Sequence, residues 1–195
     1  MGPVDLIDTT EMYLKTVFEM EEDGVVPMRA RIVERLGHSG PTVSQTVARM
    51  ERAGLITLAE DRRLELTDKG RAMARDVMRK HRLAERLLTS HEEACRWEHV
   101  MSDEVEERLN ALLSAPQTDP YGNPIPGAVG ELGQPARAEE VSLERAARSE
   151  PRVAVVSRIG EPIQADRELL ESLNEQGVLP GAVVGFRTED GDYLV

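Results

Sequence analysis

The stretch from residue 91 to residue 99 most restricts how this chain can fold, because it holds four possible metal ligands within nine residues. At 3.6 residues per turn, the four positions fall on one face of a helix. They are His91, Cys95, Glu98 and His99. Two imidazoles, a thiol and a carboxylate side by side are costly to bury unless they are exposed or a cation joins them. The pattern indicates a transition-metal site around which the other segments are arranged.

Composition restricts the class of protein. A chain of 195 residues with 40% apolar content can form one or two compact domains. It has no apolar run of about 18 residues, and its N-terminus lacks the charged and apolar regions of a signal peptide. We therefore expect a soluble, cytoplasmic protein with no membrane partner. Its single cysteine excludes an intramolecular disulfide, so Cys95 is a thiol, a thiolate or a ligand.

The net charge of −12 argues against indiscriminate coating of nucleic acid, but the charges are unevenly distributed. Residues 27–86 contain 14 Lys or Arg against 8 Asp or Glu, whereas the remainder contains 10 against 28. This basic block is either a nucleic-acid-binding region or a set of ordinary solvated helix faces, and charge alone does not separate the two.

An N-terminal helix is expected to begin after Asp8 and to end near residue 22. Asp8 and Glu11 have the spacing of a capping box. The buried stripe of this helix would consist of Tyr13, Leu14, Val17 and Phe18. Met12 lies beside that stripe, and by itself it is typical of a core or surface methionine rather than of a ligand.

A helix-turn-helix pattern follows. Helices are predicted over residues 28–36 and 41–52, separated by a glycine-containing turn, and the second helix has Pro41 in its first turn. In this motif the N-terminal end of the second helix enters the major groove. Strands at 55–58 and 64–66 then flank an arginine-bearing turn, which predicts a β-wing. A helix-turn-helix followed by such a hairpin is moderately specific for a winged helix.

Several side chains of this region could contact DNA. Val43, Val47 and Met50 would face inward, so hydroxyl and amide groups would face outward, where they can read base edges or bind phosphate. The outward set is Ser39, Thr42, Gln45, Thr46 and Arg49. Phosphate charge could be neutralised by Arg29, Arg31, Arg49 and Arg52. The wing carries Arg62 and Arg63, and Arg62 is expected to contact DNA.

The following segments are predicted in less detail. A helix over residues 67–88 carries His81 and Glu85 at i and i+4, which is either a metal-binding pair or a surface ion pair. A capped helix over 102–113 should bury its apolar residues, which are Val105, Leu109, Leu112 and Leu113. Four prolines exclude helix and sheet interior from 116–127.

The C-terminal third changes character. Residues 128–150 are acidic and are predicted to form a flexible linker. Strands are expected at 153–159, 182–187 and 193–195, with a helix at 166–176 and a hairpin turn at 189–192. Because the sequence stops as the last strand begins, this small β-domain is expected to be truncated.

Five segments together resemble the diphtheria toxin repressor family, specifically its iron-dependent repressor branch in actinobacteria. They are DTTEMYL at 8–14, SGPTVSQTV at 39–47, MRKHRLAER at 78–86, EACRWEHVM at 93–101 and GNPIPG at 122–127. The likeness extends over almost the whole chain, and the combination of motifs is highly specific.

The resemblance implies a mainly α fold with small β parts. It implies a winged helix-turn-helix DNA-binding domain at 1–74 and a helical dimerisation and metal-binding domain at 75–127. A flexible linker at 128–150 would lead to an SH3-like β-barrel at 151–195, which is C-terminally incomplete. The implied function is not enzymatic: an Fe²⁺-activated transcriptional repressor would bind palindromic operators of iron homeostasis genes as a homodimer, with one or two dimers on each operator.

The resemblance also implies two divalent-metal sites per subunit. The primary, activating site would consist of Met12, Cys95, Glu98 and His99. The ancillary site would consist of His81, Glu85, His91, Glu161 and Gln164. Base contacts are implied for Ser39, Pro41 and Gln45, and phosphate contacts for Thr42 and Ser44.

The mixed donor set leaves several metals and functions open. Thioether, thiolate, carboxylate and imidazole suit Fe²⁺ or later first-row ions, and Co²⁺, Ni²⁺, Zn²⁺ or Mn²⁺ can substitute in vitro. Alternatives are a Mn²⁺-responsive regulator of the same fold, a winged helix with structural zinc, and a metallohydrolase with an open coordination position. For the metallohydrolase, the sequence has no accompanying nucleophile motif or phosphate-binding glycine loop.

One junction departs from the family pattern. Residues 87–90 lead directly into His91, where the family has a longer segment. A continuous helix would separate His81 and His91 by about 15 Å, too far to share an ion. We therefore expect either that a segment is missing from this numbering, which we favour, or that the ancillary site is broken.

Overall fold

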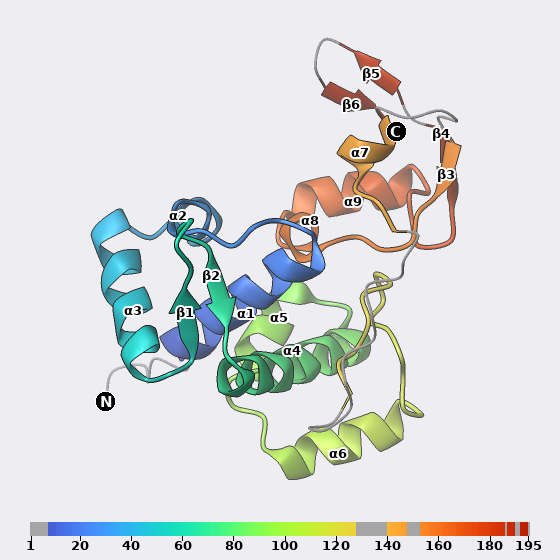
Figure 1. The fold of residues 1–195 in the computed structure, drawn as a ribbon. Coiled ribbons are helices and arrows are strands. Elements are labelled where there is room, and N and C mark those ends of the chain that lie inside the picture. Colours follow the sequence, from blue (N-terminus) through green and yellow to red (C-terminus); the bar gives the residue numbers. More distant parts are fainter. Residues whose placement is uncertain (1–7, 128–139, 148–152, 186, 190–191, 195) are drawn as a thin grey trace.

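The computed structural model describes residues 8–127, 140–147, 153–185, 187–189 and 192–194 (Figure 1). Its N-terminal part contains three helices, α1 (Thr9–Glu22), α2 (Arg29–Leu36) and α3 (Gly40–Arg52). The antiparallel pair β1 (Ile56–Leu58) and β2 (Leu64–Leu66) follows. The order of these elements is that of the predicted helix-turn-helix and wing.

Local capping explains where these helices begin and end. The Asp8 carboxylate accepts hydrogen bonds from the amides of Thr10 and Glu11, and Ser39 Oγ accepts from the amide of Thr42. Helix α2 ends at Gly37, whose φ of 66° is the left-handed conformation that glycine adopts most easily. The N-cap predicted from the sequence at Asp8 is thus confirmed, and Ser39, which was predicted to contact DNA, also caps α3.

One hydrophobic core joins α1, α2, α3 and the wing. It is formed by buried side chains that include Tyr13, Leu14, Val17, Ile32, Val43, Val47, Met50, Ile56 and Leu64. Thr46, which was predicted to face outward, is instead 7% exposed. It lies three residues after Val43 on the inward-facing side of α3, so the solvent-exposed face is narrower than expected.

The middle of the chain is helical. Helix α4 (Asp68–Leu88) packs against α1, α5 (His91–Trp97) and α6 (Asp103–Leu112), and α6 lies below it in the view of Figure 1. A second core lies here and consists of Leu83, Ala84, Ala94, Met101, Leu109 and Ile125. Val105 and Leu112 were predicted to be buried and are 47% and 71% exposed, because no segment among the described residues covers this face of α6.

A two-residue turn connects α4 to α5. Thr89 takes a left-handed conformation with φ of 50° and ends α4, and Ser90 then caps α5. The reversal brings the rings of His81 and His91 to a centroid distance of 4.9 Å. The separation of about 15 Å expected for a continuous helix is therefore wrong, because two residues are enough to reverse the chain. The missing segment stays a prediction.

The proline-rich segment forms a strap without helix or strand, apart from one isolated bridge between Thr118 and Pro124. It lies against the C-terminal region, where the amide of Ile159 donates to the carbonyl of Tyr121 at 2.9 Å. Gly122 has φ of 86°, and a Cβ there would lie 2.5 Å from the Ser157 carbonyl oxygen. Glycine allows this close approach of two backbones.

The C-terminal part begins with α7 (Leu143–Ala147), a short helix within the stretch predicted to be a flexible linker. Residues 128–139 and 148–150 of that prediction lie outside the described residues. The next elements along the chain are β3 (Val153–Val155), α8 (Glu161–Gln164) and α9 (Arg167–Glu175). The strands β4 (Val183–Gly185), β5 (Arg187–Glu189) and β6 (Asp192–Leu194) follow.

The pairing of these strands is antiparallel, β3 with β4 and β5 with β6. Among the described residues the C-terminal sheets have two strands each, so a closed SH3-like barrel stays a prediction. The mainly helical fold with small β parts is confirmed. No helix in the described residues is long and apolar enough to cross a membrane.

Candidate metal centre

A pocket of about 210 Å³ lies between α1, α5 and α8. Helix α1 lines it with four side chains at i, i+3, i+4 and i+7, which are Met12, Lys15, Thr16 and Glu19. The other walls carry His91, Cys95, Glu98, His99 and Glu161. Residues predicted for both metal sites therefore surround one pocket.

The residues predicted for the ancillary site meet beside this pocket. His81 Nε2 lies 3.2 Å from Glu161 Oε2 and 3.8 Å from Glu85 Oε2. His91 Nδ1 lies 3.1 Å from Glu85 Oε1 and 3.5 Å from Glu161 Oε2. Ligands about 2.1 Å from a tetrahedral ion are separated by about 3.4 Å, so these four side chains have suitable spacing.

Unsatisfied buried atoms support this arrangement. Among the described residues six buried side-chain atoms lack a hydrogen-bond partner, and four of them belong to the predicted ancillary ligands. These four are His81 Nε2, Glu85 Oε2, Glu161 Oε2 and Gln164 Oε1. His81 and Glu161 are within ion-pair distance but lack hydrogen-bond geometry. Because an unpaired buried polar atom is costly, a cluster of them fits a bound cation.

The residues predicted for the primary site are less closely assembled. Glu98 Oε1 lies 3.1 Å from His99 Nε2, and Met12 and Cys95 line the same pocket. His99 Nδ1 is 2.7 Å from Glu11 Oε2, a contact that fixes the ring orientation. The Cys95 sulfur lies nearer to the other set, 3.6 Å from His91 Nε2. Glu98 is the C-cap of α5, so His99 follows the helix rather than continuing it.

His81 stands between the two sets. Its Nε2 faces the ancillary carboxylates, and its Nδ1 lies 2.6 Å from Glu98 Oε2. The imidazole is completely buried. The two predicted sites are thus adjacent and share a wall.

Opposite charges offset the cost of burial here. Burial would lower the pKa of Lys15, but Glu98, Cys95 and Glu19 together raise it, so this side chain is an ammonium ion. Burial would raise the pKa of Glu98, but the charge of Lys15 and hydrogen bonds from His81 and His99 hold it well below its usual range. Glu98 is therefore a carboxylate, the form that binds metal.

The Cys95 thiol should be unusually acidic. Burial alone would raise its pKa, but hydrogen bonds from His81 and His91 and the charge of Lys15 lower it to about 6. We predict that alkylation of metal-free protein by iodoacetamide has a pH midpoint near this value, and that the midpoint rises to about 8.5 in denaturant. Mass spectrometry reports one site, because the chain has one cysteine. A native midpoint equal to the denatured one would contradict the prediction.

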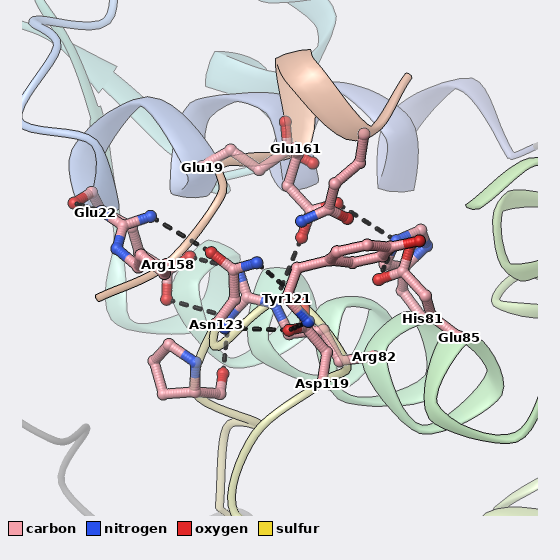
Figure 2. Close-up of polar contacts among 12 residues, drawn as sticks. Glu19, Glu22, His81, Arg82, Glu85, Asp119, Tyr121, Asn123, Arg158 and Glu161 are labelled. Carbon is pink, nitrogen blue, oxygen red and sulfur yellow. Dashed lines mark hydrogen bonds and ion pairs between the residues drawn. The ribbon is translucent and has the colours of Figure 1, made fainter. Parts of the chain in front are cut away.

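Buried ion pairs connect this centre to α1 and α8, as Figure 2 shows. The Arg82 guanidinium donates to Glu22 Oε2 at 2.6 Å, to Glu161 Oε1 at 3.2 Å and to the Pro124 carbonyl at 2.6 Å. Burial would lower the pKa of Arg82, but Glu22 and Glu161 keep it above its usual range. Arg82 on α4 therefore holds α1, α8 and the strap together.

The strap and the C-terminal region contribute a second cluster to this network (Figure 2). Arg158 Nη1 donates to Asp23 Oδ1 at 3.0 Å, and Arg158 Nη2 donates to the Glu22 carbonyl at 2.8 Å. Asn123 Nδ2 donates to Asp119 Oδ2 at 2.8 Å and to the Ile159 carbonyl at 2.9 Å. The C-terminal end of α1 is thereby fixed to the region that carries Glu161.

The predicted DNA-contacting residues lie on the other side of the N-terminal domain. Those on α3 and the wing are exposed: Ser39, Pro41, Thr42, Ser44, Gln45, Arg49, Arg52 and Arg62. Arg29 is half-buried, and its Nε is buried without a hydrogen-bond partner. Ser39 Oγ is 2.7 Å from Thr42 Oγ1, so these two hydroxyls also stabilise the start of α3.

Sequence reasoning missed Glu11, Lys15, Glu19 and Arg82 as parts of the centre. The available signal was the spacing of Met12, Lys15, Thr16 and Glu19, which puts one largely polar face on α1. A face of this kind is normally solvated, so the pattern alone does not distinguish it from a pocket wall.

Comparisons with known proteins agree with this architecture. Residues 5–64 match the family described as "Iron dependent repressor, N-terminal DNA binding domain". Residues 67–127 match "Iron dependent repressor, metal binding and dimerisation domain". Together these matches extend over more than half of the chain.

The sequence is similar to known repressors along most of its length. It is 54% identical over 201 residues to "Iron-dependent repressor IdeR" of Mycobacterium tuberculosis, with 96% of this chain and 87% of the relative covered. It is 51% identical over 199 residues to "Diphtheria toxin repressor" of Corynebacterium diphtheriae, with 96% and 88% covered.

A solved structure with a similar fold is "Crystal Structure of ScaR with bound Zn2+", at 27% identity and a TM-score of 0.76, with 96% of this chain and 93% of that one covered.

The family's DNA-binding and dimerisation domains account for operator DNA and a second subunit as partners, and its members bind divalent metal. Its members are repressors, which excludes the metallohydrolase alternative. The chain belongs to the iron-dependent repressor family of metal-activated transcriptional repressors.

Proposed function

We propose that this protein represses iron homeostasis genes in the cytoplasm when Fe²⁺ binds two sites per subunit. The primary site would consist of Met12, Cys95, Glu98 and His99, and the ancillary site of His81, Glu85, His91, Glu161 and Gln164. The observation that carries the proposal is the cluster of four unpaired buried atoms on His81, Glu85, Glu161 and Gln164. A bound divalent ion would supply positive charge that draws donors from different elements together.

Helix α1 is suited to carry the response toward DNA. Met12 lines the pocket, and the next residue, Tyr13, has its hydroxyl 2.8 Å from His38 Nδ1. His38 lies in the turn immediately before α3, so the pocket wall and the recognition helix are connected within a few residues. A ligand that favours one placement of α1 would bias the placement of α3 by its differential affinity for that state.

Dimerisation would use exposed apolar side chains in the part of the chain that matches the metal-binding and dimerisation domain. These are Leu87, Trp97, Val100, Val105 and Leu112, with exposed fractions from 37% to 71%. Exposed apolar side chains in such number indicate an interaction surface. A two-fold dimer would present two copies of α3 to a palindromic operator, and one or two dimers would bind each operator.

Each part of the chain would have its own role. Residues 1–74 would bind DNA, 75–127 would dimerise and hold metal, 128–150 would link, and 151–195 would form an SH3-like unit. The DNA contacts would come from the exposed α3 and wing residues and from Arg29, with bases contacted by Ser39, Pro41 and Gln45.

A Mn²⁺-responsive regulator is the second candidate, because a similar solved structure is "Manganese-dependent transcriptional repressor complex with manganese". That chain is 29% identical, with a TM-score of 0.74, and 93% of this chain and 85% of that one are covered. Iron is favoured because "Iron-dependent repressor IdeR" of Mycobacterium tuberculosis is 54% identical to this chain. The thiolate donor of Cys95 also suits Fe²⁺ better than Mn²⁺, which prefers oxygen ligands.

Operator binding with and without Fe²⁺ under anaerobic conditions tests the function. For wild type we expect a metal-induced increase in operator affinity of about 5–150-fold, the usual range of allosteric coupling. Met12→Ala and Cys95→Ala should each lose most of that increase. Fluorescence anisotropy with a palindromic operator measures it, and a second titration with Mn²⁺ compares the concentrations of the two metals that are needed for operator binding.

Gln45→Ala is the matched control, because Gln45 is exposed on α3, away from the pocket. It should change operator preference and leave metal affinity as in wild type. The proposed primary site is wrong if Met12→Ala and Cys95→Ala both respond to metal as wild type does.

A further inference from the structure

Lys15 lies inside the metal centre although no motif marks it as a ligand. Its side chain is 7% exposed, and Nζ donates to Glu98 Oε2 at 2.7 Å. The same nitrogen lies 3.0 Å from His81 Nδ1 and 3.7 Å from Cys95 Sγ. An ammonium group is therefore placed where donor atoms of three proposed ligands converge.

We propose that Lys15 is an internal competitor of the activating metal. In the metal-free protein its ammonium group binds the donor atoms of Glu98 and Cys95, and it thereby sets the metal concentration at which the protein is activated. This inference rests on the proposed function, since it assumes that Glu98 and Cys95 hold the ion.

The competition follows from the chemistry of the two cations. A buried carboxylate such as Glu98 needs a positive partner, and Lys15 provides one when metal is absent. An ammonium group has three N–H donors and no lone pair, so it cannot itself coordinate metal. Two cations a few ångströms apart repel strongly even at an effective dielectric constant of about 20. Lys15 must therefore leave Glu98 before Glu98 can bind a divalent ion.

The pocket provides a second position for the displaced ammonium group. Glu19 lies one turn after Lys15 on α1, is 7% exposed, and has its Oε1 3.9 Å from Lys15 Nζ. A change of side-chain rotamer would move the ammonium group from Glu98 toward Glu19. Met12 precedes Lys15 by three residues, about 60° away around the helix axis. The same face of α1 can thus offer an ammonium group or a thioether to the α5 donors.

NMR of the wild-type protein tests the displacement directly. The chain has three lysines, Lys15, Lys69 and Lys80, so labelling with ¹⁵Nζ-lysine gives few signals. We expect the Lys15 ammonium signal, assigned with Lys15→Arg, to shift when Zn²⁺ is added, while the Lys69 and Lys80 signals stay in place. A Lys15 signal that is unchanged at Zn²⁺ saturation would overturn the proposal.

Metal affinity gives an independent readout. Lys15→Met should bind Co²⁺ at least about tenfold more tightly than wild type, followed by the absorbance of the cobalt–thiolate complex. Lys80→Met is the matched control, because Lys80 is also buried but pairs with Asp76 and Asp103 outside the pocket. Its Co²⁺ affinity should equal that of wild type. Equal affinity in Lys15→Met and wild type would refute the competition, and the NMR result decides if Lys15→Met does not fold.

Operator binding separates this inference from the proposed function. Wild-type protein that binds operators equally with and without Fe²⁺ refutes the function itself. The role of Lys15 alone is refuted if the wild-type protein responds to Fe²⁺ and the Lys15→Met variant needs the same Fe²⁺ concentration for operator binding. If the Lys15→Met variant binds operators at an Fe²⁺ concentration about tenfold lower than wild type needs, the result supports both the proposed function and the role of Lys15.

Discussion

Replacing Arg82 with methionine should lower the free energy of unfolding of the metal-free protein by about 3–5 kcal/mol. Arg82 is 1% exposed, and its guanidinium contacts Glu22, Glu161 and the Pro124 carbonyl. Methionine has a similar length but no charge, so two carboxylates and a carbonyl would lose their shared donor. Removing one partner of a buried ion pair leaves an uncompensated charge, which costs far more than losing an exposed pair.

A second arginine between α4 and α1 provides the control. Arg71 Nη1 lies 2.7 Å from Glu21 Oε2, but its side chain is 44% exposed. Arg71→Met should cost at most about 1 kcal/mol. Urea denaturation of both variants, followed by circular dichroism, gives the comparison. Equal losses in the two variants would mean that burial of Arg82 does not determine its contribution.

Replacing Gly70 with alanine should destabilise the protein by about 3 kcal/mol or more. Gly70 lies in the first turn of α4, and a Cβ at this position would lie 1.9 Å from the Leu55 carbonyl oxygen. That atom belongs to the backbone, so no side-chain rotation can relieve the overlap. Helix α4 would have to move away from the strand that begins the wing.

Gly40→Ala is the matched control in another helix. Gly40 is the first residue of α3, and no atom lies within 4 Å of the position where its Cβ would be. Alanine favours helix over glycine by up to about 1 kcal/mol, so this variant should be as stable as wild type or more stable. The thermal unfolding midpoints of the two variants should therefore move in opposite directions, and a parallel decrease would contradict the assignment of close packing to Gly70.

The sequence predicted the N-terminal elements well because their signals are local. A cap such as Asp8 or Ser39 acts on amides two or three residues away, and a glycine such as Gly37 ends a helix by its own conformation. The resemblance to a known family supplied the grouping of Met12 with Cys95, Glu98 and His99, which no local pattern could give. Composition and periodicity alone would have left Met12 as a core methionine.

What could not be predicted depends on contacts between distant residues. Nothing in the sequence distinguishes Lys15 and Arg82 from ordinary solvated side chains. Their partners Glu98 and Glu22 lie 83 and 60 residues away in the sequence. Val105 and Leu112 fit the apolar stripe of a buried helix face, but both side chains are exposed in the single chain. The end of α4 at Leu88 was predicted, but the reversal at Thr89 was not, because a β-branched residue at positive φ is rare.

The two-residue connection between α4 and α5 has a consequence for the thermodynamics of metal uptake. A long loop before His91 would have to become ordered as the ion binds, and its loss of conformational entropy would weaken binding. Here Thr89 and Ser90 already fix the direction of α5 relative to α4. The entropy is lost when the chain folds, so His81, Glu85 and His91 would form a preorganised set of donors if they bind metal as proposed.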